Sequence, residues 1–111
     1  MDKNIIGKTV TVIVDRPLKT CHPNYPEIVY KVNYGYIKGI FAPDGEEQDA
    51  YILGVNMPVR RFTGKVIAIV RRINDIEDKL IVVPDNVTFS KQEIMEQISF
   101  QEKYFVSEIE M

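Results

Sequence analysis

Five short runs of apolar and β-branched residues, each closed by a turn, constrain the fold of this 111-residue chain more than any other feature. They cover residues 9–14, 34–41, 49–55, 66–73 and 79–83, and residues 28–30 add a further extended segment. Proline cannot donate to a strand ladder, so Pro17 ends the first run and Pro84 the last. Short strands separated by short turns are typical of small barrels. We therefore predict about five strands in a closed or nearly closed barrel.

The end of the chain has a helical period instead. Ser90 and Glu93 form a capping box, in which each side chain accepts a hydrogen bond from a free backbone amide. One face of the predicted helix collects the residues Ile94, Met95, Ile98, Gln101 and Phe105. We expect this helix to pack on the barrel wall and assign it no chemistry. The expected fold is one mainly β (α+β) domain over residues 1–111, an OB-like five-stranded barrel with one C-terminal helix.

The densest group of acids is the DGEEQD segment at residues 44–49, which holds four carboxylates in six residues. Carboxylates this close repel one another unless water or a cation separates them. Mg²⁺ prefers carboxylate oxygens and keeps several waters, so it is a suitable bridge. A solvated acidic loop and a metal site are both compatible with the segment alone.

The residues around this segment complete a longer pattern. Residues 33–37 read NYGYI, residues 44–53 read DGEEQDAYIL and residues 74–84 read NDIEDKLIVVP. Together they resemble the NYGYI…DGDPxDxLV and D…DxKLVxVP signatures of the soluble inorganic pyrophosphatases, over residues 30–84. The combination is specific, although either half alone would be weak. The resemblance implies Mg²⁺-dependent cleavage of inorganic diphosphate to two phosphates, with Mn²⁺ as an alternative cofactor.

The resemblance also implies a set of metal ligands. The aspartates at the family's metal-binding positions are Asp44, Asp49, Asp75 and Asp78. The last two are alternatives within one shortened acidic turn. Asp78 matches the family's acid better than Glu77 only if one residue is missing before Lys79, and this alignment remains open.

The catalytic residues that the resemblance implies are Glu46, Tyr34, Lys79 and Arg16. Glu46 stands at the aspartate that acts on the attacking water, and Tyr34 at a tyrosine that contacts phosphate. Tyr34 would otherwise be explained by barrel packing. Arg16 resembles the arginine of a VDR triplet, but Asp15 can instead be aligned with the glutamate of the family's E-I-P segment. Both alignments remain open.

The chain departs from the family pattern in several places. Glu46 is one methylene longer than the family's aspartate, and Lys31 stands where the family has proline. The family's helical Tyr-Lys pair is present only as Lys103-Tyr104, in reversed order. These departures weaken the implication for substrate binding more than that for metal binding, and they predict a weak activity.

Composition argues against several other classes of protein, including nucleic-acid-binding, disulfide-bonded and membrane proteins. The 14 basic and 16 acidic residues give a net charge of −2, which argues against a nucleic-acid partner. The single cysteine, Cys21, rules out an internal disulfide and suits the cytoplasm, and no apolar run predicts a signal peptide or a membrane partner. His22 beside Cys21 falls short of a zinc site and is expected to be a loop residue.

Three functions therefore remain in view. The first is a diphosphatase acting on pyrophosphate or a related small phosphoanhydride, as a homo-oligomer if it follows the family. The second is a non-catalytic relative that binds phosphate or metal as an interaction module. The third is an OB-like oligonucleotide binder, which the acidic segment disfavours because carboxylates repel a phosphate backbone.

Overall fold

The computed structural model describes residues 1–75 and 77–111, so residue 76 of the acidic turn lies outside the described residues. The described strands are β1 (Thr9–Arg16), β2 (Asn33–Phe41), β3 (Glu47–Ile52), β4 (Arg61–Arg72), β5 (Asp78–Val83) and β6 (Ser107–Glu110). The helices are the short 3-10 helix η1 (Lys3–Ile5) and α1 (Lys91–Glu102), which lies between β5 and β6 in the chain. None of the helices in this described part is long and apolar enough to cross a membrane.

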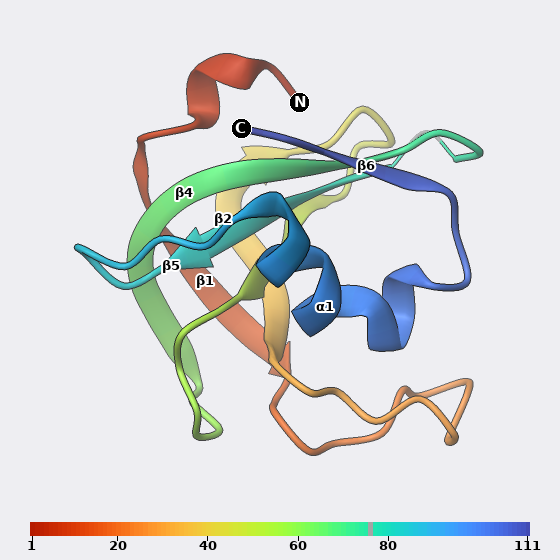
Figure 1. Cartoon of the computed structure of the whole chain (residues 1–111). Helices are drawn as coiled ribbons and strands as arrows, with labels where there is room; N and C mark the ends of the chain where they lie inside the picture. Colours follow the sequence, from red (N-terminus) through yellow and green to blue (C-terminus); the bar gives the residue numbers. More distant parts are fainter. Residues whose placement is uncertain (76) are drawn as a thin grey trace.

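The strands form a closed mixed barrel, as the sequence predicts. Their order is β1-β2-β3-β5-β4, and pairing of β1 with β4 closes the ring. The β3–β5 pair is parallel and the other pairs are antiparallel. The extra strand β6, which the sequence analysis did not predict, pairs with β4 outside the ring. Figure 1 shows α1 in front of the barrel strands, and β6 above it alongside β4.

Several strand limits differ from the prediction. β1 extends to Arg16, and β3 runs from Glu47 to Ile52 rather than over residues 49–55. β4 begins at Arg61 rather than at residue 66, because residues 61–65 pair with residues 9–13 of β1. Residues 28–30 are not part of a strand in the described sheet, although an isolated bridge between Cys21 and Val29 holds the two arms of the 17–32 loop together. This loop therefore has a fixed path beside the barrel.

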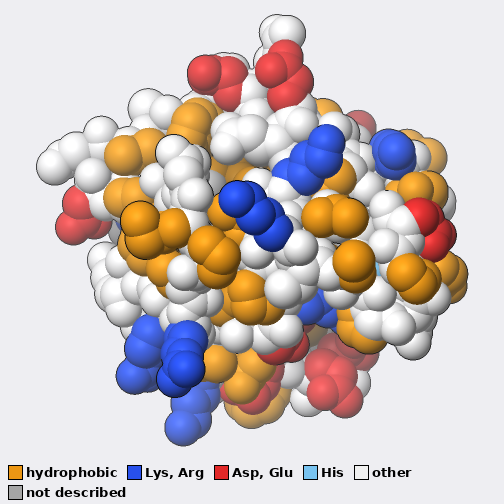
Figure 2. Space-filling view, turned by 90° about the horizontal axis from the view of Figure 1, so that it is seen from below, with side chains coloured by type: hydrophobic (Ala, Val, Ile, Leu, Met, Phe, Trp, Pro, Cys, Tyr) orange, Lys and Arg blue, Asp and Glu red, His pale blue; other side chains and the backbone are white. Residues whose placement is uncertain are grey.

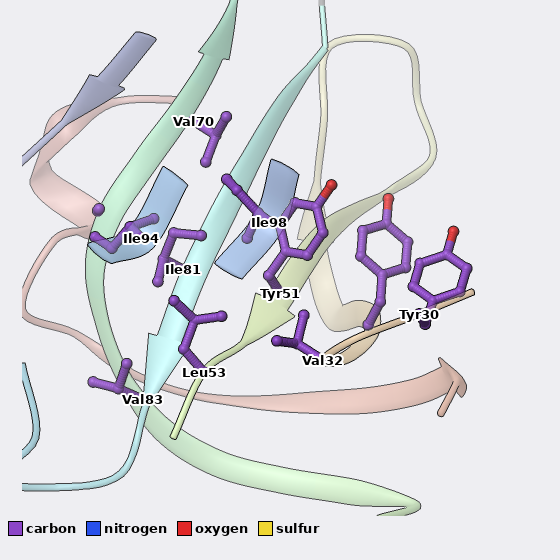
Figure 3. Packing of buried hydrophobic residues seen from close by; sticks show 11 residues of the cluster. Tyr30, Val32, Tyr51, Leu53, Val70, Ile81, Val83, Ile94 and Ile98 are labelled. Carbon is purple, nitrogen blue, oxygen red and sulfur yellow. The ribbon is translucent and has the colours of Figure 1, made fainter. Parts of the chain in front are cut away.

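Alternation along each strand produces two hydrophobic cores. The barrel interior contains Val12, Ile52 and Leu80 among its buried residues. The second core lies between the barrel wall and α1, and Figure 3 shows Tyr51, Ile81 and Ile98 among its members. In β3, therefore, even-numbered residues face inward and odd-numbered residues face α1. Asp49 follows the same rule and faces outward, beyond the end of the second core.

The predicted capping box is confirmed. The Ser90 hydroxyl accepts a hydrogen bond from the amide of Glu93 at 3.1 Å, and the Glu93 carboxylate accepts one from the amide of Ser90 at 2.9 Å. The helix face packed against the barrel is the predicted one at Ile94, Ile98 and Gln101, but Glu102 was not predicted and Phe105 lies beyond the end of the helix. It buries the residues Ile94, Ile98, Gln101 and Glu102.

Two glycines of β2 have different roles. Gly39 has a positive φ of +84° and lies where the β2–β3 register shifts, as expected for a bulge. Gly35 is paired regularly, but a Cβ there would meet the Ile13 carbonyl oxygen at 1.9 Å. The nearby irregularity is in β1 instead, between Val14 and Arg16. This bulge turns Arg16 away from the barrel interior, where Val14 packs.

Candidate active site

The register of the parallel β3–β5 pair brings Asp49 and Lys79 together. Ala50 is paired with Leu80, so the preceding residues of the two strands are neighbours on the outer face. Lys79 Nζ donates a hydrogen bond to Asp49 Oδ2 at 2.7 Å, and the Tyr34 hydroxyl donates to the same oxygen at 2.9 Å. Three of the predicted site residues thus meet at one carboxylate.

Asp49 and Lys79 line a cavity of about 350 Å³ at this end of the barrel. The acidic residues that line it are Asp15, Asp44, Glu46, Glu47, Asp49, Glu77 and Asp78. Among the described residues of the lining, Lys79 is the one basic side chain. The predicted residues Asp44, Glu46, Asp49 and Asp78 therefore share one cavity.

The β2–β3 turn fixes Asp44 and Glu46 at the edge of this cavity. Asp44 Oδ1 accepts a hydrogen bond from the amide of Glu46 at 3.0 Å, and the carbonyl of Glu46 accepts one from the amide of Ala42 at 2.8 Å. Gly45 supplies the positive φ of +87° that the turn requires. The Glu46 side chain is exposed to solvent at the cavity edge.

The lining suits a hard cation in its chemistry. Carboxylate and amide oxygens are the ligands that Mg²⁺ prefers, and Gln48, fully buried in the same lining, has an Oε1 atom without a hydrogen-bond partner. In the described part of the chain, however, no three carboxylate, histidine or cysteine side chains stand close enough together to hold a metal as they are. The donor set fits the metal, and binding requires the carboxylates to converge.

The acids of the 75–78 turn differ in their partners. Asp78 Oδ2 lies 2.6 Å from the amino group of Met1 and 3.1 Å from Arg71. Glu77 Oε2 lies 3.0 Å from Lys79 Nζ and is more exposed than Asp78. Asp75 lies 3.8 Å from Arg72 and outside the described linings of the cavities. The structure thus gathers Glu77 and Asp78, rather than Asp75, around the first cavity.

A second cavity of about 570 Å³ adjoins the first, and the two share Asp49, Glu77 and Lys79. Its lining adds two further basic side chains, Arg16 and Arg72. The Arg16 guanidinium lies 5.5 Å from the ring centroid of Tyr34, a cation–π contact made possible by the β1 bulge. The predicted residue Arg16 therefore belongs to the cavity beside the acids and not to the acidic cavity itself.

A chain of hydrogen bonds joins the two arginines beneath the second cavity. Arg16 donates to the Tyr30 hydroxyl, which donates to Gln101. Gln101 donates to the Tyr51 hydroxyl at 2.7 Å, and that hydroxyl donates to Glu102 at 2.6 Å. Arg72 completes the chain by donating to both oxygens of Glu102, at 3.1 and 2.8 Å. Figure 3 shows the Tyr30 and Tyr51 hydroxyls pointing to the same side of the cluster.

This series of hydrogen bonds was not predicted from the sequence, because no chemistry was assigned to α1. One signal was present: Ile94, Ile98 and Glu102 follow one another at intervals of four residues, which places Glu102 on the buried face of the helix. A carboxylate on a buried face requires a cationic partner. Arg72, the last residue of β4, is that partner.

Burial and neighbouring charges shift the pKa values of these groups. Burial raises the pKa of the Tyr34 hydroxyl well above its ordinary value, and the negative charge of Asp49 adds to the effect. Burial also tends to raise the pKa of Glu102, but hydrogen bonds from Arg72, Tyr51 and Ser107 outweigh it and hold that pKa below the ordinary value. Tyr34 is therefore a hydrogen-bond donor at neutral pH, and Glu102 is ionised.

The pKa values of the Asp15 carboxyl and the His22 imidazole also differ from the ordinary values of these groups. Burial raises the pKa of Asp15, the charge of Arg16 opposes the change, and the charge of Asp49 adds to it. Burial lowers the pKa of His22, and the nearby Arg16 lowers it further, so this imidazole is neutral at pH 7.

Comparison with known proteins supports the interpretation of the fold. No protein-family model and no curated protein sequence matches the chain. An inorganic pyrophosphatase structure from Ehrlichia chaffeensis aligns with a TM-score of 0.70 and 18% identity, over 93% of this chain and 85% of that one. One from Coxiella burnetii aligns at 0.67 and 15%, over 95% and 85%. One from Thermus thermophilus aligns at 0.61 and 16%, over 100% and 84%. The chain therefore has the fold of the soluble inorganic pyrophosphatases.

Proposed function

We propose that this protein is an Mg²⁺-dependent inorganic diphosphatase that cleaves pyrophosphate to two phosphates. One observation carries the proposal: the Asp49–Lys79 ion pair is the common wall of a carboxylate-lined cavity and a cavity that holds two arginines. Carboxylates suit a divalent cation, and guanidinium groups suit phosphate oxygens. A diphosphate bound beside this ion pair would have the carboxylates, with any metal that they bind, on one side. Arg16 and Arg72 would lie on the other side.

Phosphate binding is assigned to Arg16, Lys79 and Tyr34. Among the described residues, Arg16 forms no ion pair within 4.0 Å with a carboxylate, and its guanidinium borders the second cavity. Lys79 is buried but lies at the junction of the two cavities. A diphosphate would compete with Asp49 and Glu77 for its ammonium group. The Tyr34 hydroxyl, kept protonated, can donate to a phosphate oxygen as it now does to Asp49.

Metal binding is assigned to Asp44, Asp49 and Asp78; Asp75, the alternative acid of the 75–78 turn, lies outside the described lining of the acidic cavity. When bound, Mg²⁺ would neutralise charge on the diphosphate and lower the pKa of a nearby water, and Mn²⁺ would supply the same chemistry. Asp49 would then pair with the cation instead of Lys79, and Glu77 would be the one carboxylate of the described residues with which a phosphate competes for the Lys79 ammonium group. One carboxylate thus couples the two halves of the site.

Proton removal is assigned to Glu46, which lines the first cavity from the β2–β3 turn. The water oxygen attacks one phosphorus atom, the bond from that phosphorus to the bridging oxygen breaks, and Glu46 accepts the proton of the water. Its exposed side chain can adjust to the extra methylene that distinguishes it from aspartate. The departures from the family pattern still lead us to expect a slow enzyme.

The proposal extends to the surroundings of the protein. We place it in the cytoplasm as a homo-oligomer, with no nucleic-acid or membrane partner. The net charge of −2 supports the exclusion of nucleic acid, and the resemblance to the pyrophosphatases supports the oligomer. Size-exclusion chromatography with light scattering measures the oligomeric state directly.

The experiment is release of orthophosphate from pyrophosphate by the purified chain. We expect turnover with Mg²⁺, none with EDTA, and recovery when Mg²⁺ is restored. The pairing of Asp49 and Asp78 with basic groups favours one other function, a non-catalytic relative that binds phosphate. Folded protein that binds methylenediphosphonate but releases no phosphate between pH 7 and 9 would replace the first function by the second.

A further inference from the structure

The second cavity has features that pyrophosphate does not use. At about 570 Å³ it is within the usual range for pockets that hold organic ligands. Part of its lining is aromatic, whereas pyrophosphate presents only charged oxygens and has no apolar surface to place there. The cavity therefore has room and surface for a group attached to a diphosphate.

Two separate segments supply the aromatic walls. The 17–32 loop contributes His22 and Tyr25, whose ring centroids are 5.2 Å apart. The segment after α1 contributes Tyr104 and Phe105. Tyr25 and Tyr104 are 56% and 55% exposed, so their rings are accessible to a ligand in the cavity. Figure 2 views the side of the molecule on which the 17–32 loop lies and shows hydrophobic side chains across the middle of this face, with Lys and Arg among them.

The basic side of the same cavity is held rigidly. Arg16 and Arg72 are the two ends of the hydrogen-bond chain through Tyr30, Gln101, Tyr51 and Glu102. The Arg72 guanidinium also lies 3.6 Å from the ring centroid of Phe105, so the basic and aromatic parts of the lining are in contact. Side chains fixed in this way lose little entropy when a ligand binds.

We propose that the second cavity binds the organic part of a nucleoside diphosphate, with the base against Tyr25 and Tyr104 and the diphosphate toward Arg16 and Lys79. Aromatic side chains stack on bases without regard to sequence, because every base has a π-face. Glu27, an acid of the same lining, matches the hydroxyl donors of a ribose. The shared wall at Asp49 then places the terminal phosphate beside the acidic cavity.

The chemical consequence rests on the proposed diphosphatase function. Water attacks the terminal phosphorus, the bond from that phosphorus to the bridging oxygen breaks, and the bridging oxygen stays with the nucleoside monophosphate. Orthophosphate is the other product, and Glu46 accepts the proton of the water. Nucleoside diphosphates thus join pyrophosphate as a substrate class of this one site.

The test compares two non-hydrolysable ligands that differ only by the nucleoside, α,β-methylene-ADP and methylenediphosphonate. Calorimetry in Mg²⁺ measures both dissociation constants for the parent chain and for Tyr25→Ala, Tyr104→Ala and Tyr104→Phe. Phe41→Ala is the matched control, because Phe41 is 62% exposed and lies outside the described linings of both cavities. Loss of one stacking contact is expected to raise the dissociation constant roughly tenfold.

The expected result is tighter binding of α,β-methylene-ADP than of methylenediphosphonate by at least roughly tenfold. Tyr25→Ala and Tyr104→Ala should weaken the nucleotide alone, while Tyr104→Phe and Phe41→Ala leave both ligands unchanged. Equal affinity for the two ligands, or tyrosine variants that bind the nucleotide as the parent does, would overturn the inference. Because binding is measured without turnover, an inactive protein that passes this test would refute the diphosphatase function and retain the nucleotide site.

Discussion

Asp49 on β3 and Lys79 on β5 form an ion pair of 2.7 Å across the parallel strand pair, at the junction of two adjoining cavities. The first cavity is lined mainly by carboxylates, whereas the second combines acidic, basic and aromatic side chains, with Arg16 and Arg72 added to the shared Lys79. Neither strand alone contains the residues of the site. The closed barrel brings residues that are 30 positions apart in the chain into one contact.

Metal affinity should depend on Asp49. We expect Asp49→Asn to weaken Mg²⁺ binding by at least roughly tenfold, because the amide carries no charge. Asp85→Asn is the matched control, since Asp85 is exposed and lies outside the described linings of both cavities. Isothermal titration of Mg²⁺ and Mn²⁺ into the three proteins measures the difference. Equal affinities in all three would remove Asp49 from the metal site.

Glu46 provides a test of proton removal. Glu46→Gln should be far slower than the parent, because an amide cannot accept the proton. If the backbone of the turn has adapted to the longer side chain, Glu46→Asp should lose at least roughly tenfold in rate, since a displacement of about 1 Å can cost on the order of 10²-fold. Steady-state turnover at saturating Mg²⁺ measures both, with the exposed Glu108→Gln as control. A Glu46→Gln rate equal to that of the parent would exclude Glu46 from the chemistry.

Glu102 should make stability depend on pH. Its pKa in the folded state is held below the ordinary value of 4.5, so its stabilising effect is present above about pH 4.5 and is lost as the pH falls through the folded-state pKa. Glu102→Gln should lower the free energy of unfolding by about 3 kcal/mol at pH 7, because the buried Arg72 loses its fully buried partner and keeps only the more exposed carboxylates of Glu77 and Asp75. The penalty should shrink toward pH 3. Urea unfolding at several pH values measures the free energy of unfolding of the parent and of Glu102→Gln. A difference between the two proteins that does not change with pH would contradict the assignment.

Gly35 should be intolerant of any side chain. A Cβ would meet the Ile13 carbonyl oxygen at 1.9 Å, so Gly35→Ala must separate β1 from β2 and displace Arg16 and Tyr34. We expect a loss of more than about 4 kcal/mol in the free energy of unfolding. Gly7→Ala is the control: it has a positive φ of +97° but nothing within 4 Å, and it should cost about 1–2 kcal/mol. Similar losses in the free energy of unfolding for Gly35→Ala and Gly7→Ala, measured with urea, would show that the close approach of residue 35 to the Ile13 carbonyl is unimportant.

Sequence reasoning captured much of the fold because local rules decide it. Ser90 and Glu93 cap the helix, and the turn of Asp44 and Gly45 connects β2 and β3, both through contacts a few residues apart. The strand β6 was missed because residues 107–110 contain only one large apolar residue, Ile109, and therefore show no strand pattern. Its position depends on pairing with β4, which is remote in the sequence.

The site was predictable only in part. Resemblance singled out Asp49, Lys79 and Tyr34, and the structure brings their side chains together. It did not reveal the bulge after Val14 that turns Arg16 outward, since a register shift depends on the partner strand. The same limit applies to Arg72 and Glu102, because a buried ion pair between β4 and α1 depends on their packing in three dimensions.

The most direct test of the whole account is pyrophosphate turnover by the parent chain, Asp49→Asn and Asp85→Asn, measured together by phosphate release with Mg²⁺ and with EDTA. We expect the parent and Asp85→Asn to turn over pyrophosphate with Mg²⁺ but not with EDTA. The turnover rate of Asp49→Asn with Mg²⁺ should be lower by at least roughly tenfold. The three proteins should unfold at similar urea concentrations, so that the loss reports on the site. Turnover by Asp49→Asn at the parent rate, or none by any of the three, would contradict the account.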